Sequence, residues 1–275
     1  MLNSKNIACG LTLYNPSAAD IENVLHYAKW FDKVYVYDNT EDNYDDKKLK
    51  NSNKIFFVAQ GKNNGLGIAC DELCQYAKND GYEFIILFDQ DSRMDFNSLT
   101  ALTENIGLNL QVAIYCPQIV YQKGSKNNSH DMKTVEWCIT SGSCVRLEQY
   151  GLKYKFDVNY FIDRLDLDFC RQITESGYII CQNNEAVLYQ QLGDELHKIG
   201  YMQYSTHGSI RHYYLARNRL YYNHKFGIVG YSFPQTIKHI LMILFYEKKK
   251  VEKVTMVYRG VRDYRMHRMG KRGDI

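Results

Sequence analysis

Two carboxylates, Asp89 and Asp91, directly follow the apolar run 84–88 (Phe-Ile-Ile-Leu-Phe). A continuous apolar run predicts a strand covered on both faces, as in a parallel sheet, and such sheets bind ligands beyond the carboxyl ends of their strands. Mg²⁺ and Mn²⁺ prefer oxygen ligands and are often shared between one or two carboxylates and a substrate's phosphates. The pair therefore indicates a site for a metal-bound nucleotide diphosphate. The alternative is that both acids open a turn and cap the next helix, which Ser92 or Asp95 could also do.

Other polar clusters follow other predicted strands. Asp38 and Asn39 come after the run 34–37 and could hydrogen-bond a base or a ribose, or simply form a turn. The segment 63–67 (Asn-Asn-Gly-Leu-Gly) precedes a predicted helix, whose N-terminus could contact a nucleotide, or it is a tight connecting turn. It is not a dinucleotide fingerprint, because Cys70 stands where the third glycine belongs and the motif follows the third strand.

Three acids, Asp163, Asp166 and Asp168, crowd a predicted junction between a strand and a helix. One of them is a candidate general base that takes a proton from an attacking hydroxyl. The alternative is that acids in the first helical turn are stabilised by the helix dipole. Upstream, the small-residue segment 140–143 (Thr-Ser-Gly-Ser) would allow a ligand to approach the backbone closely.

The elements that position these residues alternate between strand and helix, as in a mainly parallel α/β sheet. Strands are predicted over 7–13, 34–37, 55–59, 84–88 and 113–116, and a helix near 99–106. The run 160–171 is predicted as an apolar strand that leads into a helix. From about residue 213 the chain is predicted to be helical, with a break around 227–234, and the polar segment 123–131 is predicted to be an exposed loop.

Length and composition limit the class of protein. A chain of 275 residues fits one large domain, with or without an appendage, and its net charge of +3 does not indicate a nucleic-acid partner. Eight cysteines scattered through apolar runs are typical of a reducing cytosol. The first residues lack the pattern of a signal peptide, and no apolar run approaches the ~20 residues of a transmembrane helix. We therefore expect a cytoplasmic protein.

The final segment, 247–272, carries ten Lys and Arg against three acids, interleaved with Val, Met and Tyr. A basic amphipathic helix of this kind is typical of a membrane-surface segment, here on the inner face of the plasma membrane. A solvated helix and a contact between copies in an oligomer are the alternatives.

Taken together, the motifs resemble those of the inverting family 2 glycosyltransferases of the GT-A fold, and most closely those of bacterial rhamnosyltransferases of cell-surface polysaccharide synthesis. The resemblance covers nearly the whole chain, and its specificity lies in the order of the motifs. They are Thr12-Leu13-Tyr14-Asn15-Pro16, Tyr37-Asp38-Asn39, Asn63-Asn64-Gly65-Leu66-Gly67, Asp89-Gln90-Asp91-Ser92, Thr140-Ser141-Gly142-Ser143, Phe161-Ile162-Asp163 with Leu165-Asp166-Leu167-Asp168, Arg211 to Asn218, and Tyr258 to Asp263.

The resemblance implies a Rossmann-like α/β fold: a mainly parallel central sheet flanked by helices, with a GT-A catalytic domain over 1–225 and a helical, basic C-terminal extension over 226–275. It implies that Asp166 is the general base, with Asp163 as the fallback, and that Asp91 and Asp89 hold the metal. The donor-binding set that it implies is Thr12, Tyr14, Asn15, Asp38, Asn64, Gly65, Asp89, Gln90, Asp91, Arg211, Arg217 and Asn218, and the acceptor-binding set is Ser141, Gly142 and Ser143. For Arg211, Arg217 and Asn218, packing of a C-terminal helix is the alternative.

One position departs from the family pattern. Many GT-A enzymes carry a metal-binding His about two dozen residues after the base, whereas this chain has Gln190 there. An amide is a weaker metal ligand than imidazole, although His207 lies downstream and could substitute. The cofactor expected is Mn²⁺ or Mg²⁺, with less dependence on tight coordination than the carboxylate pair suggests.

The implied reaction transfers a sugar from a nucleotide-diphosphate donor to a hydroxyl of a saccharide or lipid-linked saccharide, with rhamnose from dTDP-rhamnose as the best guess. A UDP-hexose donor is one alternative. A second is a catalytically silent sugar-nucleotide-binding assembly subunit, which would be expected to have lost either the base or the Asp pair. A nucleotidyltransferase is disfavoured because no basic glycine-rich phosphate loop lies near the first strand.

Overall fold

A computed structural model describes residues 6–41, 47–121, 129, 131–190, 196–199, 202–205 and 207–273. The chain divides into two compact units. The first unit comprises Met1–Val158 and Leu165–Gln191, and the second comprises Asn159–Arg164 and Leu192–Ile275. The predicted loop 123–131 lies almost entirely outside the described residues.

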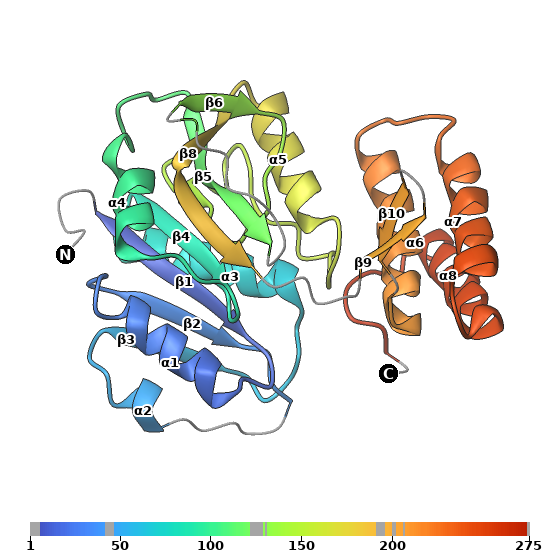
Figure 1. Cartoon of the computed structure of the whole chain (residues 1–275), viewed down its shortest axis with the longest axis horizontal. Helices are drawn as coiled ribbons and strands as arrows, with labels where there is room; N and C mark the ends of the chain where they lie inside the picture. Colours follow the sequence, from blue (N-terminus) through green and yellow to red (C-terminus); the bar gives the residue numbers. More distant parts are fainter. Residues whose placement is uncertain are drawn as a thin grey trace. The chain divides into compact units, whose positions relative to one another are not determined.

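The first unit is built on one eight-stranded sheet with the strand order β3-β2-β1-β4-β7-β5-β8-β6 (Figure 1). Strands β1, β2, β3 and β4 run parallel to one another, whereas β7 is antiparallel to both of its neighbours. The strands are β1 (Ile7–Leu13), β2 (Val34–Asp38), β3 (Ile55–Ala59), β4 (Phe84–Asp89), β5 (Val112–Tyr121), β6 (Met132–Val135), β7 (Cys144–Arg146) and β8 (Ile179–Gln190).

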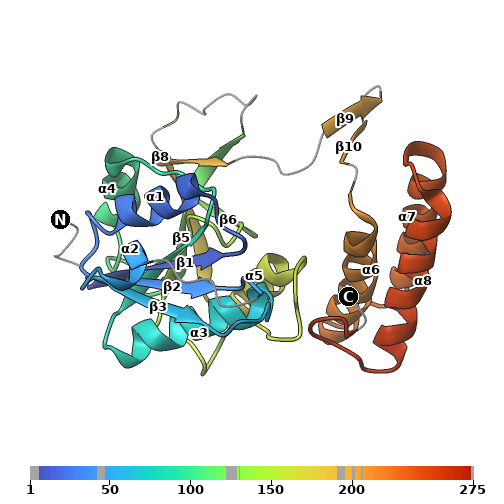
Figure 2. The same ribbon diagram turned by 90° about the horizontal axis from the view of Figure 1, so that it is seen from below.

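Helices cover both faces of this sheet, and α1 and α3 lie on opposite sides of it (Figure 2). Every residue of β1 and β2 is buried, which explains why their sequences are largely apolar. On the α1 side, Tyr27 stacks on Phe88 of β4 with ring centroids 4.3 Å apart. The helices of this unit are α1 (Ala18–Tyr27), α2 (Lys47–Lys50), α3 (Leu66–Asn79), α4 (Phe96–Glu104) and α5 (Leu165–Glu175).

The predicted strand over 160–163 is wrong. The chain instead makes a tight turn there, with Asp163 and Arg164 at φ values of 61° and 68°, before α5 begins. The aromatic residues that suggested a strand pack on helix α6: Tyr160 lies 5.3 Å from Tyr221 and Phe161 lies 5.0 Å from Tyr214, between ring centroids. Their apolar pattern therefore reflects packing against a helix and not sheet pairing.

The second unit contains a two-stranded sheet, β9 (Leu196–Ile199) and β10 (Met202–Ser205), and the helices α6 (Ser209–Lys225), α7 (Ser232–Tyr246) and α8 (Lys250–Arg265). The interruption between α6 and α7 confirms the predicted break around 227–234. Helices α6 and α8 lie very close together at Gly260. A Cβ on this residue would be only 2.4 Å from the carbonyl oxygen of Tyr213, so the close approach requires glycine.

Two further expectations concern this unit. Among the described residues, no helix is both long enough and apolar enough to cross a bilayer. The boundary between the two compact units lies near residue 192, because α6 packs on α8 and so belongs to the second unit. The predicted boundary between the catalytic domain and the C-terminal extension lies after residue 225. That functional boundary stays a prediction.

Candidate active site

The parallel strands of the first unit bring the polar clusters to one edge of the sheet. Thr12 of β1 pairs with Tyr37 on one side and with Asp89 on the other, and Leu13 pairs with Asp38. The ends of β1, β2 and β4 are therefore adjacent in space. The order of these strands along the chain does not by itself give their order in the sheet. This edge is where an open α/β sheet binds ligands.

Asp38 forms the innermost part of this edge. Its side chain is fully buried, and its Oδ1 accepts hydrogen bonds from the backbone N of Thr40 (2.9 Å) and from the Thr40 hydroxyl (2.6 Å). Its Oδ2 is buried and has no hydrogen-bond partner among the described residues. A buried carboxylate oxygen without a donor is costly, so Asp38 is suited to accept an N–H or O–H from a ligand.

The neighbouring donor-site candidates form a connected rim around Asp38. The backbone N of Tyr14 donates to the Gln90 side chain (2.7 Å), and the backbone N of Asn15 donates to Thr40 (2.9 Å). Tyr14 is 48% exposed, so its ring is available to a ligand.

Asn64 is held at the end of β2, because its amide donates to the Tyr37 hydroxyl (2.8 Å). Gly65, at φ 84°, begins the first turn of α3 beside Asn64. The structure thus brings together Thr12, Tyr14, Asn15, Asp38, Asn64, Gly65, Asp89, Gln90 and Asp91 at one edge of the sheet.

Three carboxylates meet beyond the end of β4. Burial, the negative charge of Asp166 and the negative charge of Asp91 together raise the pKa of Asp89 to about 7. Burial also raises the pKa of Asp91. The Gln190 amide donates to Asp89 (3.2 Å) and opposes the shift, but its own Oε1 is buried without a partner among the described residues. The site therefore concentrates negative charge that a cation would relieve.

Asp166 is placed by the loop that precedes β7. The backbone N of Thr140 donates to its Oδ1 (2.9 Å), and the Thr140 hydroxyl donates to the same oxygen. The loop is anchored to the sheet because the Ser141 hydroxyl accepts from the backbone N of Asp89 (3.0 Å) and donates to Ser92 (2.7 Å). Asp166 and Asp89 are thus fixed relative to each other by one short segment.

The acceptor-site candidates Ser141, Gly142 and Ser143 are themselves buried. Gly142 adopts φ 79°, and a Cβ there would be 2.9 Å from Pro117, so the tight turn requires glycine. These contacts give the three residues a supporting role, and direct acceptor contact stays a prediction for them.

A cavity of about 140 Å³ opens beside this loop, and Tyr121, Trp137 and Ser141 are among the residues that line it. Trp137 is 54% exposed, and the pKa of Tyr121 is raised by burial and by the charge of Asp166. Aromatic rings suit the apolar face of a sugar, and Asp166, whose charge acts on Tyr121, is an acceptor for sugar hydroxyls.

The residues at this edge fit a divalent cation. No group of three or more His, Cys, Asp or Glu side chains in the described part of the chain is arranged as a complete metal site. However, Mg²⁺ and Mn²⁺ commonly need only one or two protein carboxylates when substrate phosphates supply the rest. The mutual repulsion of Asp89, Asp91 and Asp166, and the unpartnered oxygen of Gln190, are what such a cation would relieve.

The remaining candidates lie in the second unit. Asp163 accepts from the Arg211 guanidinium (3.2 Å), and Asn218 donates to the backbone carbonyls of Ile162 (2.6 Å) and Asp163 (3.2 Å). Their contacts hold the turn before α5. His207 lies 6.0 Å from His212 between ring centroids, and its metal role stays a prediction.

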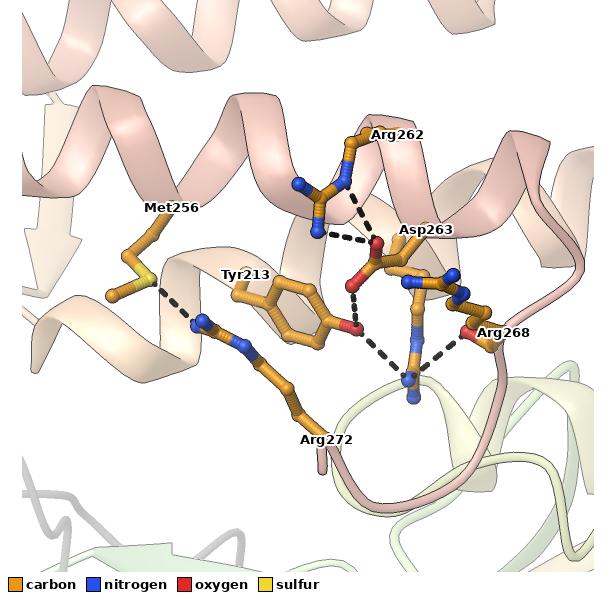
Figure 3. A network of polar contacts seen from close by, with 7 residues as sticks. Tyr213, Met256, Arg262, Asp263, Arg268 and Arg272 are labelled. Atoms are coloured by element: carbon orange, nitrogen blue, oxygen red, sulfur yellow. Dashed lines mark hydrogen bonds and ion pairs between the residues drawn. The ribbon is translucent and has the colours of Figure 1, made fainter. Parts of the chain in front are cut away.

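Arg217 is completely buried within the second unit. Its guanidinium donates to the carbonyl of Gly270 (2.8 Å) and lies over the Tyr213 ring, while the Tyr213 hydroxyl donates to Asp263 (3.0 Å; Figure 3). These contacts correspond to the packing role that the sequence left open for Arg217 and Asn218. Donor contact by Arg211, Arg217 and Asn218 stays a prediction.

Sequence reasoning missed three residues of the site. Tyr121 and Trp137 were overlooked because the sequence alone does not distinguish an aromatic residue of the core from one that lines a ligand site. Thr140 was noted only as part of a small-residue turn, and its hydrogen bonds to Asp166 join segments 26 residues apart. Only the three-dimensional structure reveals these relations.

Comparisons with known proteins identify a family and a fold. The model of the family described as glycosyl transferase family 2 matches residues 21–168, more than half of the chain. The dTDP-rhamnosyl transferase RfbF of Shigella flexneri is 25% identical over 233 residues, which cover 78% of this chain and 79% of that protein.

Two solved structures are similar in fold. GalNAc-T7, crystallised with UDP, GalNAc and Mn²⁺, superposes with a TM-score of 0.55 at 11% identity, covering 69% of this chain. This chain spans only 44% of the GalNAc-T7 chain. TarS 1–349 of S. aureus, crystallised with UDP-GlcNAc, has a TM-score of 0.50 at 13% identity and covers 94% of this chain and 72% of that one. These likenesses confirm the predicted GT-A fold class.

Proposed function

The chain belongs to glycosyl transferase family 2 and is a glycosyltransferase. From this premise we propose that it transfers a sugar from a nucleoside diphosphate to an acceptor hydroxyl, with inversion of the anomeric centre. In this proposal Asp166 is the general base. The proposal rests on the proximity of three carboxylates. Asp166 and Asp91 lie close enough to Asp89 for their negative charges to raise its pKa. A base and a diphosphate site must lie this close for a direct displacement.

The proposed chemistry is a single displacement at the anomeric carbon. The Asp166 carboxylate takes the proton of the acceptor hydroxyl as its oxygen forms the new bond to that carbon. The bond between the anomeric carbon and the diphosphate oxygen breaks, and its electron pair leaves with the diphosphate. Attack from the face opposite the leaving group inverts the anomeric centre. The hydrogen bonds from Thr140 hold Asp166 in one orientation for this step.

Asp91, together with Asp89 in its ionised form, would hold the divalent cation. The chemistry that such a cation supplies is neutralisation of the charge on the departing diphosphate. GalNAc-T7 was crystallised with Mn²⁺, which supports this choice of metal, and Gln190 would contribute through its unpartnered oxygen.

For the donor, we favour dTDP-rhamnose, since the Shigella relative is a dTDP-rhamnosyl transferase. The unpartnered Oδ2 of Asp38 supports a base with a ring N–H, which thymine and uracil both have. A UDP-hexose is therefore the alternative, and both solved neighbours were crystallised with a uridine nucleotide.

The acceptor would be a saccharide, free or lipid-linked, that enters the cavity lined by Tyr121 and Trp137. A silent binding subunit is the rival hypothesis. The charge coupling between Asp166 and Asp89 argues against it, because a silent relative would have no need to maintain a base beside the metal site.

The test compares Asp166→Asn with Asp163→Asn. We expect Asp166→Asn to keep nucleotide binding and lose transfer by about 10²–10⁴-fold, as removal of a general base does. Asp163→Asn tests the fallback base, and we expect a smaller loss from it because Asp163 is paired with Arg211. Asp32→Asn, which changes an exposed acid outside the site, is the control that should keep full activity. Activity would be followed as release of nucleoside diphosphate in the presence of acceptor. Normal turnover by Asp166→Asn would refute this base, and no release by wild type with any donor would favour the silent subunit.

A further inference from the structure

The second unit contains a cavity of its own between α6, α7 and the turn before α5. Its volume of about 340 Å³ lies within the range of about 300–1,000 Å³ that is usual for small-molecule sites. The lining includes Arg164, Arg219, Lys238 and His239, and the apolar side chains of Leu215 and Met242. No residue that the sequence analysis assigned to the donor, acceptor or metal is part of this lining.

The charge of this cavity is unbalanced. It has three cationic side chains and, among the described residues that line it, no carboxylate. Two acids of this unit already have partners: Asp163 pairs with Arg211 (3.2 Å), and Glu247 accepts from His212 (3.1 Å) and pairs with Lys253. Burial and the neighbouring charge of Arg164 lower the pKa of Arg219 to about 10, which indicates that two guanidinium groups are held close together.

The cationic groups are also held in place before any ligand arrives. Arg219 is only 7% exposed and its Nη2 donates to Thr236 of α7 (3.1 Å). Arg164 lies over the Tyr222 ring, 5.6 Å from its centroid. Fixing cations in advance lowers the entropic cost of binding an anion.

Two buried polar atoms of this wall lack partners in the described part of the chain: Nε of Arg219 and Nδ1 of His239. Arg219 is more than nine-tenths buried, and an unsatisfied guanidinium N–H at such a depth is costly. The other ring nitrogen of His239 is occupied, since Nε2 lies 2.9 Å from Nδ1 of His212. The two atoms differ in what they need. Because His212 donates its Nε2–H to Glu247, its Nδ1 accepts from His239 and leaves Nδ1 of His239 as a lone pair, so Nε of Arg219 is the unsatisfied donor that calls for a ligand oxygen.

We propose that this cavity binds a phosphate or diphosphate group through Arg164, Arg219 and Lys238. Phosphate oxygens match the geometry of guanidinium groups and carry enough charge to balance three cations. The volume exceeds that of a single phosphate, and Leu215 and Met242 provide an apolar wall for the remainder of the ligand. The binding does not depend on sugar transfer, because the cavity belongs to the second unit alone.

Two sources of this group are chemically equivalent, a lipid headgroup and a soluble phosphate compound. Helix α7 presents large exposed apolar side chains, among them Phe233, Ile237 and Leu241, at the four-residue spacing of one helix face. A lipid phosphate would use such a face, whereas a soluble compound would not.

The experiment is calorimetric titration of inorganic pyrophosphate into the full chain without divalent metal, in an Asp91→Asn background that removes the proposed donor site. We expect binding, weakened about tenfold or more by Lys238→Ala and by Arg219→Gln, since each removes a charged contact to phosphate. Lys248→Ala removes a similarly exposed lysine outside the cavity and should change the affinity less than about twofold. Because Arg219 also joins α6 to α7, the exposed Lys238 provides the variant that keeps the fold.

The source is decided with vesicles of phosphatidylcholine that contain phosphatidic acid. Co-sedimentation that Lys238→Ala reduces more than Lys47→Ala, which changes an exposed lysine of α2, assigns the site to a lipid headgroup. Equal co-sedimentation of these two variants, together with pyrophosphate binding that is lost in Lys238→Ala but kept in Lys248→Ala, assigns it to a soluble phosphate. Absence of pyrophosphate binding in the Asp91→Asn background, or equal losses in Lys238→Ala and Lys248→Ala, would overturn the proposal. Failure of Asp166→Asn to lose transfer would leave these titrations unaffected.

Discussion

At the scale of single residues, the site is built from carboxylates whose surroundings differ. Asp38 is buried, and one of its carboxylate oxygens has no hydrogen-bond donor among the described residues. The negative charges of Asp166 and Asp91 raise the pKa of Asp89, and hydrogen bonds from Thr140 orient Asp166. The same chemical group thus serves nucleotide recognition, cation binding and proton transfer in the proposed mechanism. The differences come from partners that the fold supplies.

Asp38→Asn tests the nucleotide pocket. The two donors of Thr40 would keep the amide oxygen at the Oδ1 position, so the amide NH₂ would take the place of Oδ2. A donor would then face the ring N–H of thymine or uracil, and nucleotide binding should weaken about tenfold or more. A thermal-shift screen of dTDP-rhamnose, UDP-hexoses and GDP-mannose, with and without Mn²⁺, measures it. Asp32→Asn, an exposed acid outside the site, is the control, and unchanged binding by Asp38→Asn would contradict the assignment.

Asp89 gives cation binding a pH dependence. Its pKa of about 7 lies above the usual value for a carboxyl, so the group is mostly protonated at pH 6 and mostly ionised at pH 8. A cation competes with that proton, and Mn²⁺ affinity should be about tenfold lower at pH 6 than at pH 8. Calorimetric titration at the two pH values measures this change. Asp89→Asn should bind Mn²⁺ more weakly and with a smaller pH effect, and an equal affinity of wild type at both pH values would argue against the role of Asp89.

At the scale of elements, the strand ends were the predictable part. Buried parallel strands have largely apolar sequences, so β1, β2 and β4 and the clusters that follow them could be found without a structure. The antiparallel β7 could not, because three residues carry too little pattern. The turn at 159–164 was misassigned because Tyr160 and Phe161 pack on a helix made much later in the chain.

The contact between α6 and α8 gives a stability prediction. Gly260→Ala would place a Cβ 2.4 Å from the Tyr213 carbonyl oxygen, so the two helices must move apart. We expect a loss of about 1–3 kcal/mol in the free energy of unfolding, the usual cost of overpacking, measured by urea denaturation. Gly273→Ala, where no atom lies within 4 Å of the added Cβ, should be nearly neutral. Equal stability of the two variants would show that the helices are not in tight contact.

At the scale of the whole molecule, the near balance of charge conceals an uneven distribution. The segment 247–272 carries an excess of Lys and Arg, and three consecutive exposed lysines lie between the end of α7 and the first residue of α8: Lys248, Lys249 and Lys250. Deleting residues 247 to 275 is a poor test of membrane binding, because it removes α8 and with it the Tyr213–Asp263 contact inside the second unit. Point substitutions that keep α8 are better suited.

The triple variant Lys248→Gln, Lys249→Gln, Lys250→Gln tests membrane association. We expect wild type to co-sediment with anionic vesicles and the variant to do so less, at about 1 kcal/mol per lysine at low ionic strength. The matched control replaces Lys47, Lys48 and Lys50 of α2, which are also exposed and lie close together. Equal co-sedimentation of both triple variants would rule out a specific role for the C-terminal lysines.

The turn that precedes the base has a consequence for synthesis. Residues 159–164 belong to the second unit although the chain on either side belongs to the first, so the chain passes between the units three times. The Asn218 amide that holds the carbonyl of Ile162 is translated 56 residues later. On the ribosome, the turn at 159–164 therefore cannot make this contact until α6 has emerged, and a nascent chain that stops short of α6 would have the sheet and α5 but not the partner that holds the turn between them.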